Sequence, residues 1–240
     1  MIKKIILTVL LVLSCSITFA KPKQPVNYWI VEGTAFFINN SGYMVTAAHV
    51  IRGSHDFKIL YKKDIVNVYL VAEDDDSDIA ILRVGEPITT DYFAIDLPKD
   101  KEEVMVLGFP VVAKFGMYIH ITMGPLLMTA DDLTDYYVYA KSCHGNSGGP
   151  VVNSRNRVVG VLVSGWSDMA TDNGECSFHS GAVNSSALIK LALNHNVPLD
   201  YGITDYKDFP SISASIYLLE DQNRVVFIYG IVNDQEAHSK

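Results

Sequence analysis

The segment Gly145–Pro150, which reads GNSGGP, constrains this chain more than any other feature of its sequence. A serine becomes a nucleophile only where a tight turn projects its hydroxyl and aims backbone N–H groups at the developing negative charge. Glycine at position 145 permits such a turn and leaves its amide beside that of Ser147 as a pair of oxyanion donors. Two further glycines allow close packing behind the serine. The segment therefore predicts a reactive Ser147.

Two upstream segments offer the partners that a serine nucleophile needs. Thr46–Val50 reads TAAHV and places His49 at the end of an apolar, strand-like run. Ser77–Leu82 reads SDIAIL and places Asp78 directly before another such run. An imidazole can accept the serine proton, and a carboxylate can orient the imidazole. Taken singly, the histidine would be an ordinary core or surface residue and the aspartate an ordinary turn residue.

With these three segments together, the chain resembles trypsin-like serine peptidases of the chymotrypsin-type double-barrel fold. It is most similar to the short bacterial HtrA-type (Do-like) peptidase domains without a PDZ domain. The order His49, Asp78, Ser147 is that family's order, and the separations of 29 and 69 positions suit its compact bacterial members. The resemblance covers about residues 28–195.

The resemblance implies a serine endopeptidase that acts through an acyl-enzyme, without metal or organic cofactor. Ser147 would be the nucleophile, His49 the general base, and Asp78 the group that fixes the histidine tautomer. The amides of Gly145 and Ser147 would form the oxyanion hole. Three neighbouring acids complicate the choice of aspartate, but only Asp78 directly precedes the apolar run; the others are Asp74, Asp75 and Asp76. His144 is expected at the rim of the substrate pocket rather than as the base.

The resemblance also implies a substrate pocket, for which two alternatives stay open. Lys141 occupies the position that the family places at the base of the primary pocket, where a cation would favour acidic side chains. Alternatively, Lys141 extends to solvent and the pocket is shaped by Val163, Ser164, Gly165 and Trp166.

A disulfide between Cys143 and Cys176, flanking the pocket, is a further implication of the resemblance. Cys143 stands where many members carry a half-cystine, and Cys176 lies on the loop that usually supplies its partner. Closing a loop of 33 residues stabilises a fold by roughly 3–4 kcal/mol in the chain-entropy model. The alternative is two unpaired thiols.

Residues 1–20 have the character of an export signal, because two lysines precede the short apolar run Ile5–Leu13. The run is too short for a confident membrane span. Cleavage after Ala20 would release a secreted or periplasmic protein. A lipoprotein-type site ending in Cys15 is the alternative, and it alone would attach the protein to a membrane.

The composition narrows the possible partners. The chain has 240 residues and is 49% apolar, which suffices for a core of ordinary size. Residues 1–20 carry two lysines and no acid, so their removal would leave 17 basic and 27 acidic side chains and a net charge of −10. Such a charge disfavours nucleic-acid binding, and protein or peptide substrates are expected instead. The sequence does not indicate an oligomeric state.

Short β-branched runs separated by turn signals predict an all-β fold. We expect two six-stranded antiparallel barrels, in residues 21–100 and 101–195, with the boundary near the charged segment Pro98–Glu102. A helix over 186–194, capped by Asn184 and Ser185, is predicted to end the second barrel. The expected strands are Thr34–Asn39, Tyr43–Thr46, Phe57–Tyr61, Val66–Ala72, Ile79–Val84, Val104–Gly108, Met117–Met123, Tyr136–Ala140, Val151–Asn153, Val158–Ser164 and Phe178–Val183.

Residues 196–240 are predicted to form an extension that is too short for a PDZ domain. The runs Ile212–Leu219 and Val225–Val232 flank a polar turn and predict an extra β-hairpin that packs on a barrel.

Two other functions remain as alternatives to the enzyme. The chain could be a catalytically silent member that binds protein, which the complete set His49, Asp78 and Ser147 disfavours. It could also be a lipid-anchored interaction module of the same fold, which Cys15 keeps open.

Overall fold

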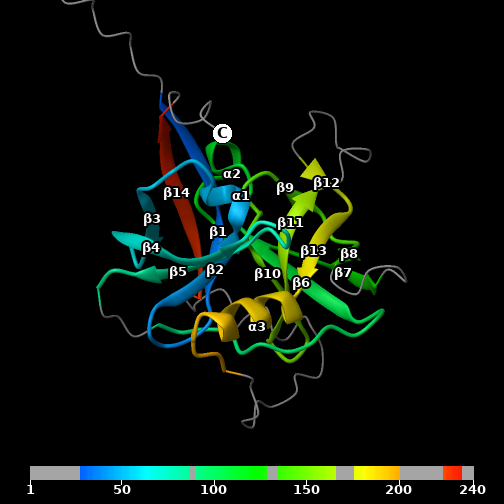
Figure 1. The fold of residues 1–240 in the computed structure, drawn as a ribbon. Helices are drawn as coiled ribbons and strands as arrows, with labels where there is room; N and C mark the ends of the chain where they lie inside the picture. The colour runs from blue at the N-terminus through cyan, green and yellow to red at the C-terminus, as the bar shows by residue number, and fades with distance from the viewer. Residues whose placement is uncertain (1–27, 87–89, 129–134, 166–175, 201–223, 234–240) are drawn as a thin grey trace, which may run out of the picture.

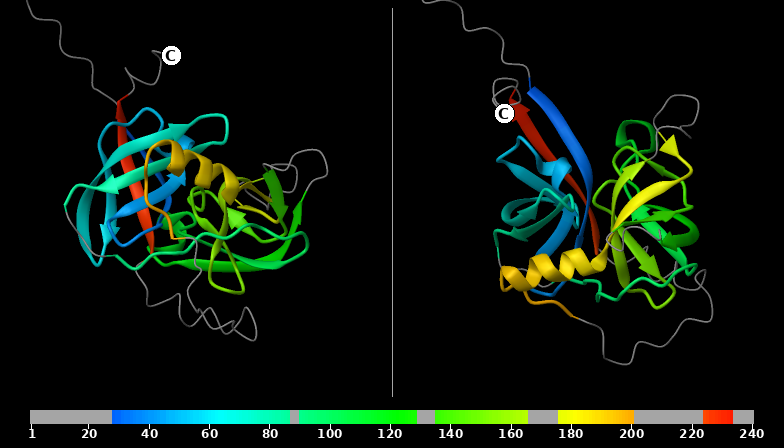
Figure 2. Two further views of the ribbon diagram at one scale, coloured as in Figure 1. Left: turned by 60° about the horizontal axis from the view of Figure 1, so that its bottom comes forward. Right: turned by 45° about the vertical axis from the view of Figure 1, so that its right-hand side comes forward.

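The computed structural model describes residues 28–86, 90–128, 135–165, 176–200 and 224–233. Most of these residues lie in strands, which form two closed barrels packed beside each other (Figures 1 and 2). The predicted all-β architecture of two six-stranded antiparallel barrels is thereby confirmed. Three short helices complete the described part, and none of them is long and apolar enough to cross a membrane: α1 (Ala48–Ile51), α2 (Val112–Phe115) and α3 (Ser185–Asn194).

The first barrel has the strand order β1-β14-β3-β4-β5-β2, and all its neighbouring strands are antiparallel. Five of its strands come from the N-terminal part of the chain and one from the C-terminal part. They are β1 (Tyr28–Phe37), β2 (Tyr43–Ala47), β3 (Phe57–Tyr61), β4 (Asp64–Asp74), β5 (Ile79–Val84) and β14 (Val225–Asn233).

The second barrel has the order β10-β11-β13-β8-β7-β6, again antiparallel throughout. Two very short strands, β9 (Ser142–Cys143) and β12 (Cys176–Ser177), pair separately beside it. The barrel strands are β6 (Glu103–Gly108), β7 (His120–Met128), β8 (Asp135–Val138), β10 (Pro150–Asn153), β11 (Val158–Gly165) and β13 (Ser180–Asn184).

The position of β14 differs from the expected extra hairpin, and the first barrel is not confined to residues 21–100. β14 lies between β1 and β3, in a register that runs from Tyr28↔Asn233 to Phe36↔Val225 along β1. The reason is that β14 carries four consecutive buried apolar residues, from Val225 to Ile228, and closes the barrel, so that neither β1 nor β3 is left with an unpaired edge. The other predicted arm, Ile212–Leu219, lies outside the described residues.

The burial of the strands follows from their sequence patterns. In β3 the side chains of Phe57, Ile59 and Tyr61 are buried and alternate with partly exposed ones, as the period of two in a strand requires. Between the barrels, aromatic side chains meet edge to face: Phe109 of the second barrel contacts Phe227 of β14, with ring centroids 6.0 Å apart. The core is thus continuous across the two barrels.

Helix α3 crosses the base of both barrels (Figures 1 and 2), where it contacts β4 and β5 of the first and β11 and β13 of the second. The predicted cap is present, because the Asn184 side chain accepts a hydrogen bond from the Ser186 amide at 2.9 Å. Ser185 donates to the Asp96 carbonyl at 2.5 Å and so ties the start of the helix to the segment that links the barrels.

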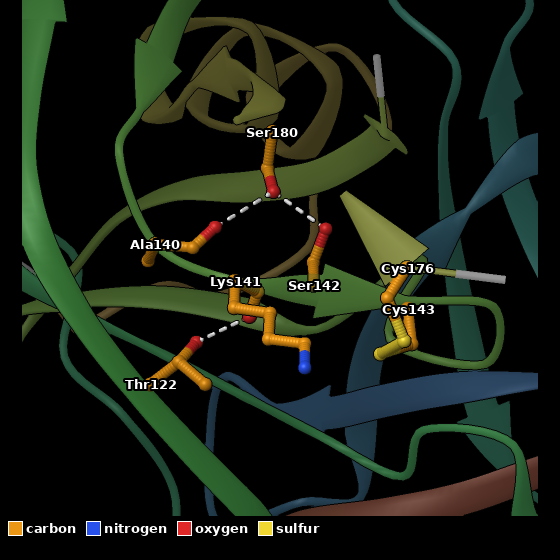
Figure 3. Close-up of a disulfide and its surroundings, with 7 residues drawn as sticks. All are labelled: Thr122, Ala140, Lys141, Ser142, Cys143, Cys176 and Ser180. Atoms are coloured by element: carbon orange, nitrogen blue, oxygen red, sulfur yellow. Dashed lines mark hydrogen bonds between the residues drawn. A yellow bond between two sulfur atoms is a disulfide. The ribbon is translucent and has the colours of Figure 1, made fainter. Parts of the chain in front are cut away.

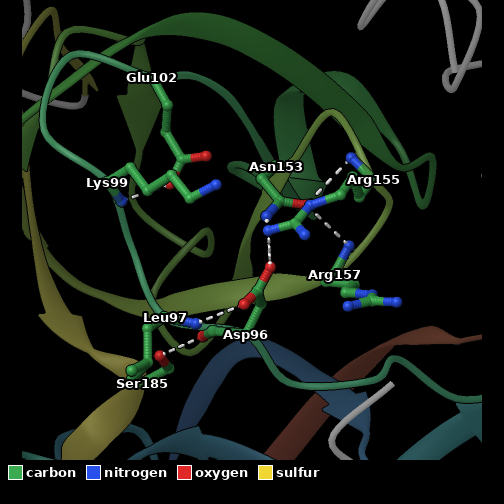
Figure 4. A network of polar contacts seen from close by, with 8 residues as sticks. All are labelled: Asp96, Leu97, Lys99, Glu102, Asn153, Arg155, Arg157 and Ser185. Atoms are coloured by element: carbon green, nitrogen blue, oxygen red, sulfur yellow. Dashed lines mark hydrogen bonds and ion pairs between the residues drawn. The ribbon is translucent and has the colours of Figure 1, made fainter. Parts of the chain in front are cut away.

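The Asp96 carboxylate organises a polar network on the same side of the second barrel (Figure 4). It forms an ion pair with Arg155 and accepts a hydrogen bond from the Asn153 amide group at 3.2 Å. The Asn153 side-chain oxygen in turn accepts from the backbone amides of Arg155 and Arg157. The inter-barrel segment is thereby fixed to the turn after β10.

Two titratable groups near this network are shifted by burial. Desolvation raises the pKa of half-buried Glu102, although its hydrogen bond from the Lys99 amide and the Lys99 charge oppose that shift. Desolvation, followed by the charge of Glu102, raises the pKa of the buried Tyr136 hydroxyl well above its ordinary value. Both groups belong to the second barrel and are separate from the site described next.

Candidate active site

The pairing of β2 with β5 brings His49 next to Asp78. The last pair of this ladder is Ala47↔Ile79, so the residues that follow β2 and precede β5 must face each other. The Ala48 amide donates to the Asp78 carbonyl at 2.9 Å. Asp78 adopts a left-handed conformation with φ +52°, which turns the chain into β5.

The Asp78 carboxylate contacts two nitrogens of His49. Oδ1 accepts from the His49 backbone amide at 2.8 Å, and Oδ2 lies 2.5 Å from Nδ1 of the ring. Because an ionised carboxylate only accepts hydrogen bonds, Nδ1 is the nitrogen that donates to it, and in the neutral form of the ring Nε2 is then the acceptor. The His49 side chain is 38% exposed and that of Asp78 is 27% exposed, so the pair is reachable at the surface.

Two of the three neighbouring carboxylates, those of Asp74 and Asp75, are engaged elsewhere. Asp75 forms an ion pair with Arg52 at 2.9 Å. Asp74 accepts from the Ser77 hydroxyl at 2.8 Å and from the Asp76 amide at 3.2 Å. Among these aspartates, Asp78 is the one that accepts the hydrogen bonds of His49.

Ser147 lies in a tight turn between β9 and β10. The turn is closed by hydrogen bonds from the Asn146 amide to the Cys143 carbonyl and from the Gly149 amide to the Asn146 carbonyl. Gly145 has φ +91°, and a Cβ there would stand 2.3 Å from the Phe109 carbonyl oxygen. Glycine is therefore required at position 145 both by the backbone angle and by the space.

The Ser147 turn is seated against the segments around His49. The Thr34 amide donates to the Ser147 carbonyl at 2.9 Å. A Cβ on Gly148 would lie 2.7 Å from the Ala47 nitrogen, and one on Gly33 would lie 2.7 Å from Val50 and 3.1 Å from the Ser147 carbonyl oxygen. The structure thus brings the backbones of the His49 and Ser147 segments together at the junction of the barrels.

The amides assigned to the oxyanion hole belong to this turn. Neither the Gly145 nor the Ser147 amide donates to a backbone carbonyl of another described residue. Their neighbours in the turn, Asn146, Gly148 and Gly149, all do. An oxyanion site needs donors without a backbone partner, and this turn contains two of them.

The predicted pocket residues are only partly within the described chain. Lys141 is exposed, and its ammonium lies 5.9 Å from the centre of the Phe178 ring, which supports the alternative in which it extends to solvent. Ser164 and Gly165 end β11, opposite Gly181 and Ser180 of β13. Trp166 lies outside the described residues.

Cys143 and Cys176 form a disulfide with an S–S distance of 2.06 Å (Figure 3). It joins β9 to β12, which pair at these two residues. Beside it, the buried Ser142 and Ser180 hydroxyls contact each other at 2.5 Å, and Ser180 donates to the Ala140 carbonyl at 3.2 Å. The strand that leads into the Ser147 turn is therefore held on both sides.

The structure also shows a residue that sequence reasoning missed. Thr34 of β1 hydrogen-bonds to the Ser147 turn through both its backbone and its hydroxyl. A single threonine in a strand carries no distinguishing signal. As for metals, the described residues contain no group of three or more His, Cys, Asp or Glu side chains that could hold an ion.

In a comparison with protein families, residues 33–161 match the family model of the trypsin-like peptidase domain. The chain is 31% identical over 139 residues to a probable periplasmic serine endoprotease DegP-like of Rhizobium meliloti, a match that covers 54% of this chain and 27% of that protein. It is 28% identical over 159 residues to serine protease Rv3671c of Mycobacterium tuberculosis, covering 62% and 39% respectively. The chain thus spans well under half the length of these relatives.

Solved structures share the fold. The HtrA-type protease AlgW with a decapeptide matches with a TM-score of 0.59 and 18% identity, over 70% of this chain and 53% of that one. The inactive form of Rv3671c protease matches with a TM-score of 0.53 and 21% identity, over 70% and 87%. At these identities the likeness establishes the double-barrel architecture.

Proposed function

Because the chain belongs to the trypsin-like peptidase family, we propose that it is a serine endopeptidase whose nucleophile is Ser147. His49 is the general base in this proposal, and Asp78 orients it. The observation that carries the proposal is the double contact of the Asp78 carboxylate with the amide and Nδ1 of His49. That contact leaves Nε2 of the histidine free to accept a proton, which is the state a serine nucleophile requires.

The proposed reaction proceeds through two tetrahedral intermediates. His49 takes the Ser147 proton on Nε2 while the serine oxygen attacks the carbonyl carbon of the substrate. The amides of Gly145 and Ser147 stabilise the oxyanion, and the Asp78 charge stabilises the imidazolium. His49 then returns the proton to the leaving amine, and an acyl-enzyme remains. A water molecule, deprotonated by the same nitrogen, hydrolyses that ester and regenerates Ser147.

The substrates proposed here are proteins or peptides, and no metal or organic cofactor takes part. The site supports this because a base, an orienting acid and two adjacent amide donors suffice for acyl transfer. The exposed position of Lys141 over the Phe178 ring gives no reason to propose a preference for acidic side chains.

We also propose that the protein works after export, in the periplasm or outside the cell. The support is the signal-like pattern of residues 1–20 and the word periplasmic in the names of DegP-like relatives. Metabolic labelling with a palmitate analogue tests whether the exported protein is cleaved after Ala20 or lipidated at Cys15. Incorporation that depends on Cys15 would show that the protein is anchored by a lipid on Cys15 and is not released by cleavage after Ala20.

A fluorophosphonate probe, which reacts covalently with activated serines, tests the enzymatic proposal. We expect the wild-type protein to be labelled and Ser147→Ala not to be labelled. Ser41→Ala changes an exposed turn serine and serves as the matched control, which should be labelled like the wild type. A well-folded wild-type protein that takes up no probe would overturn the proposal in favour of a silent, protein-binding member of the family.

A further inference from the structure

Thr34 stands at the point where the two barrels and the Ser147 turn meet. It lies in β1 and is completely buried. β1 pairs with β2 only at Phe36 and Phe37, so the preceding residues of that edge are free to face the Ser147 turn. The Thr34 backbone uses this edge fully: its amide donates to the Ser147 carbonyl at 2.9 Å, and its carbonyl accepts from the Thr46 hydroxyl at 2.8 Å.

The Thr34 hydroxyl adds two further hydrogen bonds. It donates to the Gly145 carbonyl at 2.7 Å and accepts from the Phe109 amide at 3.0 Å. A hydroxyl can donate once while it accepts, so this one group serves both a backbone acceptor and a backbone donor. Because the site is fully buried, no bulk water is at hand to replace either bond.

These bonds bracket the peptide unit that carries the Ser147 amide. The carbonyl of Gly145 belongs to the preceding peptide unit and the carbonyl of Ser147 to the following one, and Thr34 holds both. The Ser147 N–H lies on the unit between them. Its direction is therefore set by the two anchors on Thr34 together with the Gly149 amide, which donates to the Asn146 carbonyl on that same unit. The anchor on the Gly145 carbonyl also restrains Gly145, the other proposed oxyanion donor.

Thr34 also links this turn to the histidine segment. Thr46 of β2, which donates to the Thr34 carbonyl, lies three residues before His49 in the sequence. A Cβ on Gly148 would stand only 2.2 Å from the Thr34 carbonyl oxygen and 2.3 Å from the Thr46 hydroxyl. The turn is thus packed directly onto this pair of threonines. A shift of Thr34 would therefore move both the Ser147 turn and the strand that leads to His49.

We propose that Thr34 is a positioning residue, whose hydroxyl fixes the oxyanion-binding geometry of the Ser147 turn. The inference rests on the proposed peptidase function and deepens it. Thr34 itself contacts no reacting atom; it acts through Gly145 and Ser147. Serine can replace it, because it keeps the hydroxyl, whereas valine keeps the shape and removes both hydrogen bonds.

The test compares Thr34→Val and Thr34→Ser with the matched control Thr90→Val. Thr90 is likewise buried, and its hydroxyl donates to a distant carbonyl, that of Asn39, at 2.8 Å, but among the described residues it forms no hydrogen bond with the Ser147 turn. The measurements are the rate of fluorophosphonate labelling, kcat and KM on fluorescein-labelled casein, and the thermal midpoint. Thr34→Ala accompanies the series as a second hydroxyl deletion if the valine variant does not fold.

We expect Thr34→Val to lower kcat and the labelling rate about 100-fold, the size of effect that misplaced oxyanion donors produce, with KM nearly unchanged. Thr34→Ser should restore most of both rates. Thr90→Val should lower the thermal midpoint and leave both rates unchanged. Folded Thr34→Val or Thr34→Ala that reacts at the wild-type rate would overturn the proposal, as would an equal loss of rate in Thr90→Val.

Amide exchange measured by NMR separates this inference from the function on which it rests. Removal of the hydroxyl should speed hydrogen exchange at the Phe109 amide and shift the amide resonances of Gly145 and Ser147, and Thr34→Ser should reverse both changes. This readout does not require activity. Unlabelled wild-type protein would refute the peptidase, whereas unchanged resonances in Thr34→Val would refute the positioning role.

Discussion

The Asp78 carboxylate holds His49 at two points, with Oδ1 on the backbone amide at 2.8 Å and Oδ2 on the ring nitrogen Nδ1 at 2.5 Å. One side chain therefore fixes the start of helix α1 and the orientation of the imidazole that α1 carries. The left-handed backbone of Asp78, with φ +52°, makes both contacts possible from a residue that directly precedes a strand.

Asp78→Asn should retain the fold and lose the activity. Asparagine tolerates a left-handed backbone and can still accept from the His49 amide. Its amide group would favour the wrong histidine tautomer, so we expect kcat to fall by about 10⁴. Turnover of labelled casein measures the loss, and circular dichroism checks the fold. Asp75→Asn, which breaks only the surface pair with Arg52, should keep nearly full activity; a similar loss in both variants would contradict the assignment.

Gly145→Ala should abolish activity and destabilise the protein by at least about 2 kcal/mol. A left-handed residue with a side chain costs about 1–2 kcal/mol, and the new Cβ would also stand 2.3 Å from the Phe109 carbonyl oxygen. Gly116→Ala is the control, since Gly116 has φ +78° but only the exposed side chain of Tyr118 nearby. Urea unfolding compares the two. Equal destabilisation would show that the contact with Phe109 is unimportant.

Removal of the disulfide should lower the free energy of unfolding by about 3–4 kcal/mol, because it closes a loop of 33 residues. The double variant Cys143→Ser, Cys176→Ser tests this in chemical denaturation. Dithiothreitol should shift the wild-type midpoint down to that of the double variant and leave the variant itself unaffected. A wild-type midpoint that does not respond to reductant would speak against the bond.

Glu102→Gln should stabilise the protein at neutral pH and not under acid conditions. Burial raises the pKa of Glu102 in the folded state, so the folded protein holds this proton more tightly than the unfolded chain. Ionised Glu102 therefore costs stability as the pH rises through its folded pKa, and that cost vanishes below the unfolded value of about 4.3. Melting temperatures between pH 4 and pH 8 measure the difference. Glu103→Gln, on the exposed side of β6, should show no such gain.

Tyr136→Phe should leave stability unchanged or raise it by up to about 1 kcal/mol. The Tyr136 hydroxyl is buried and has no hydrogen-bond partner among the described residues, so its removal relieves an unsatisfied group. Tyr92→Phe is the contrast, because its hydroxyl donates to the Asp200 carboxylate at 2.8 Å. We expect that variant to lose about 1–2 kcal/mol. Urea denaturation that ranks the two variants in the opposite order would contradict the prediction.

Local patterns in the sequence predicted the parts of the fold whose determinants are local. The strand Phe57–Tyr61 and the cap at Asn184 have the predicted positions, because alternation and capping depend on neighbouring residues. β14 was predicted as a strand, but its place was wrong. Its partners β1 and β3 lie about 170 or more residues away, and the sequence of a strand does not identify which distant strand it pairs with.

The candidate site likewise combines features with local and with distant determinants. The glycines of the Ser147 turn and the pairing of His49 with Asp78 could be predicted, because each belongs to a short sequence motif whose residue types indicate its chemistry. The roles assigned to these residues stay predictions until the labelling experiment is done. Thr34 escaped notice because its importance arises from a crossing of three chain segments, and a lone threonine in a strand does not reveal that crossing.

The insertion of β14 between β1 and β3 has a consequence for the order in which the protein is made. Of the described strands, β1 is synthesised first and β14 last, so the barrel that begins earlier in synthesis can close only after the later barrel is complete. Until then the edges of β1 and β3 stay open to pairing with other chains, and helix α1, which carries His49, lacks its contacts with β14. A nascent or truncated chain that ends before residue 225 should therefore depend on chaperones and be a ready target for degradation.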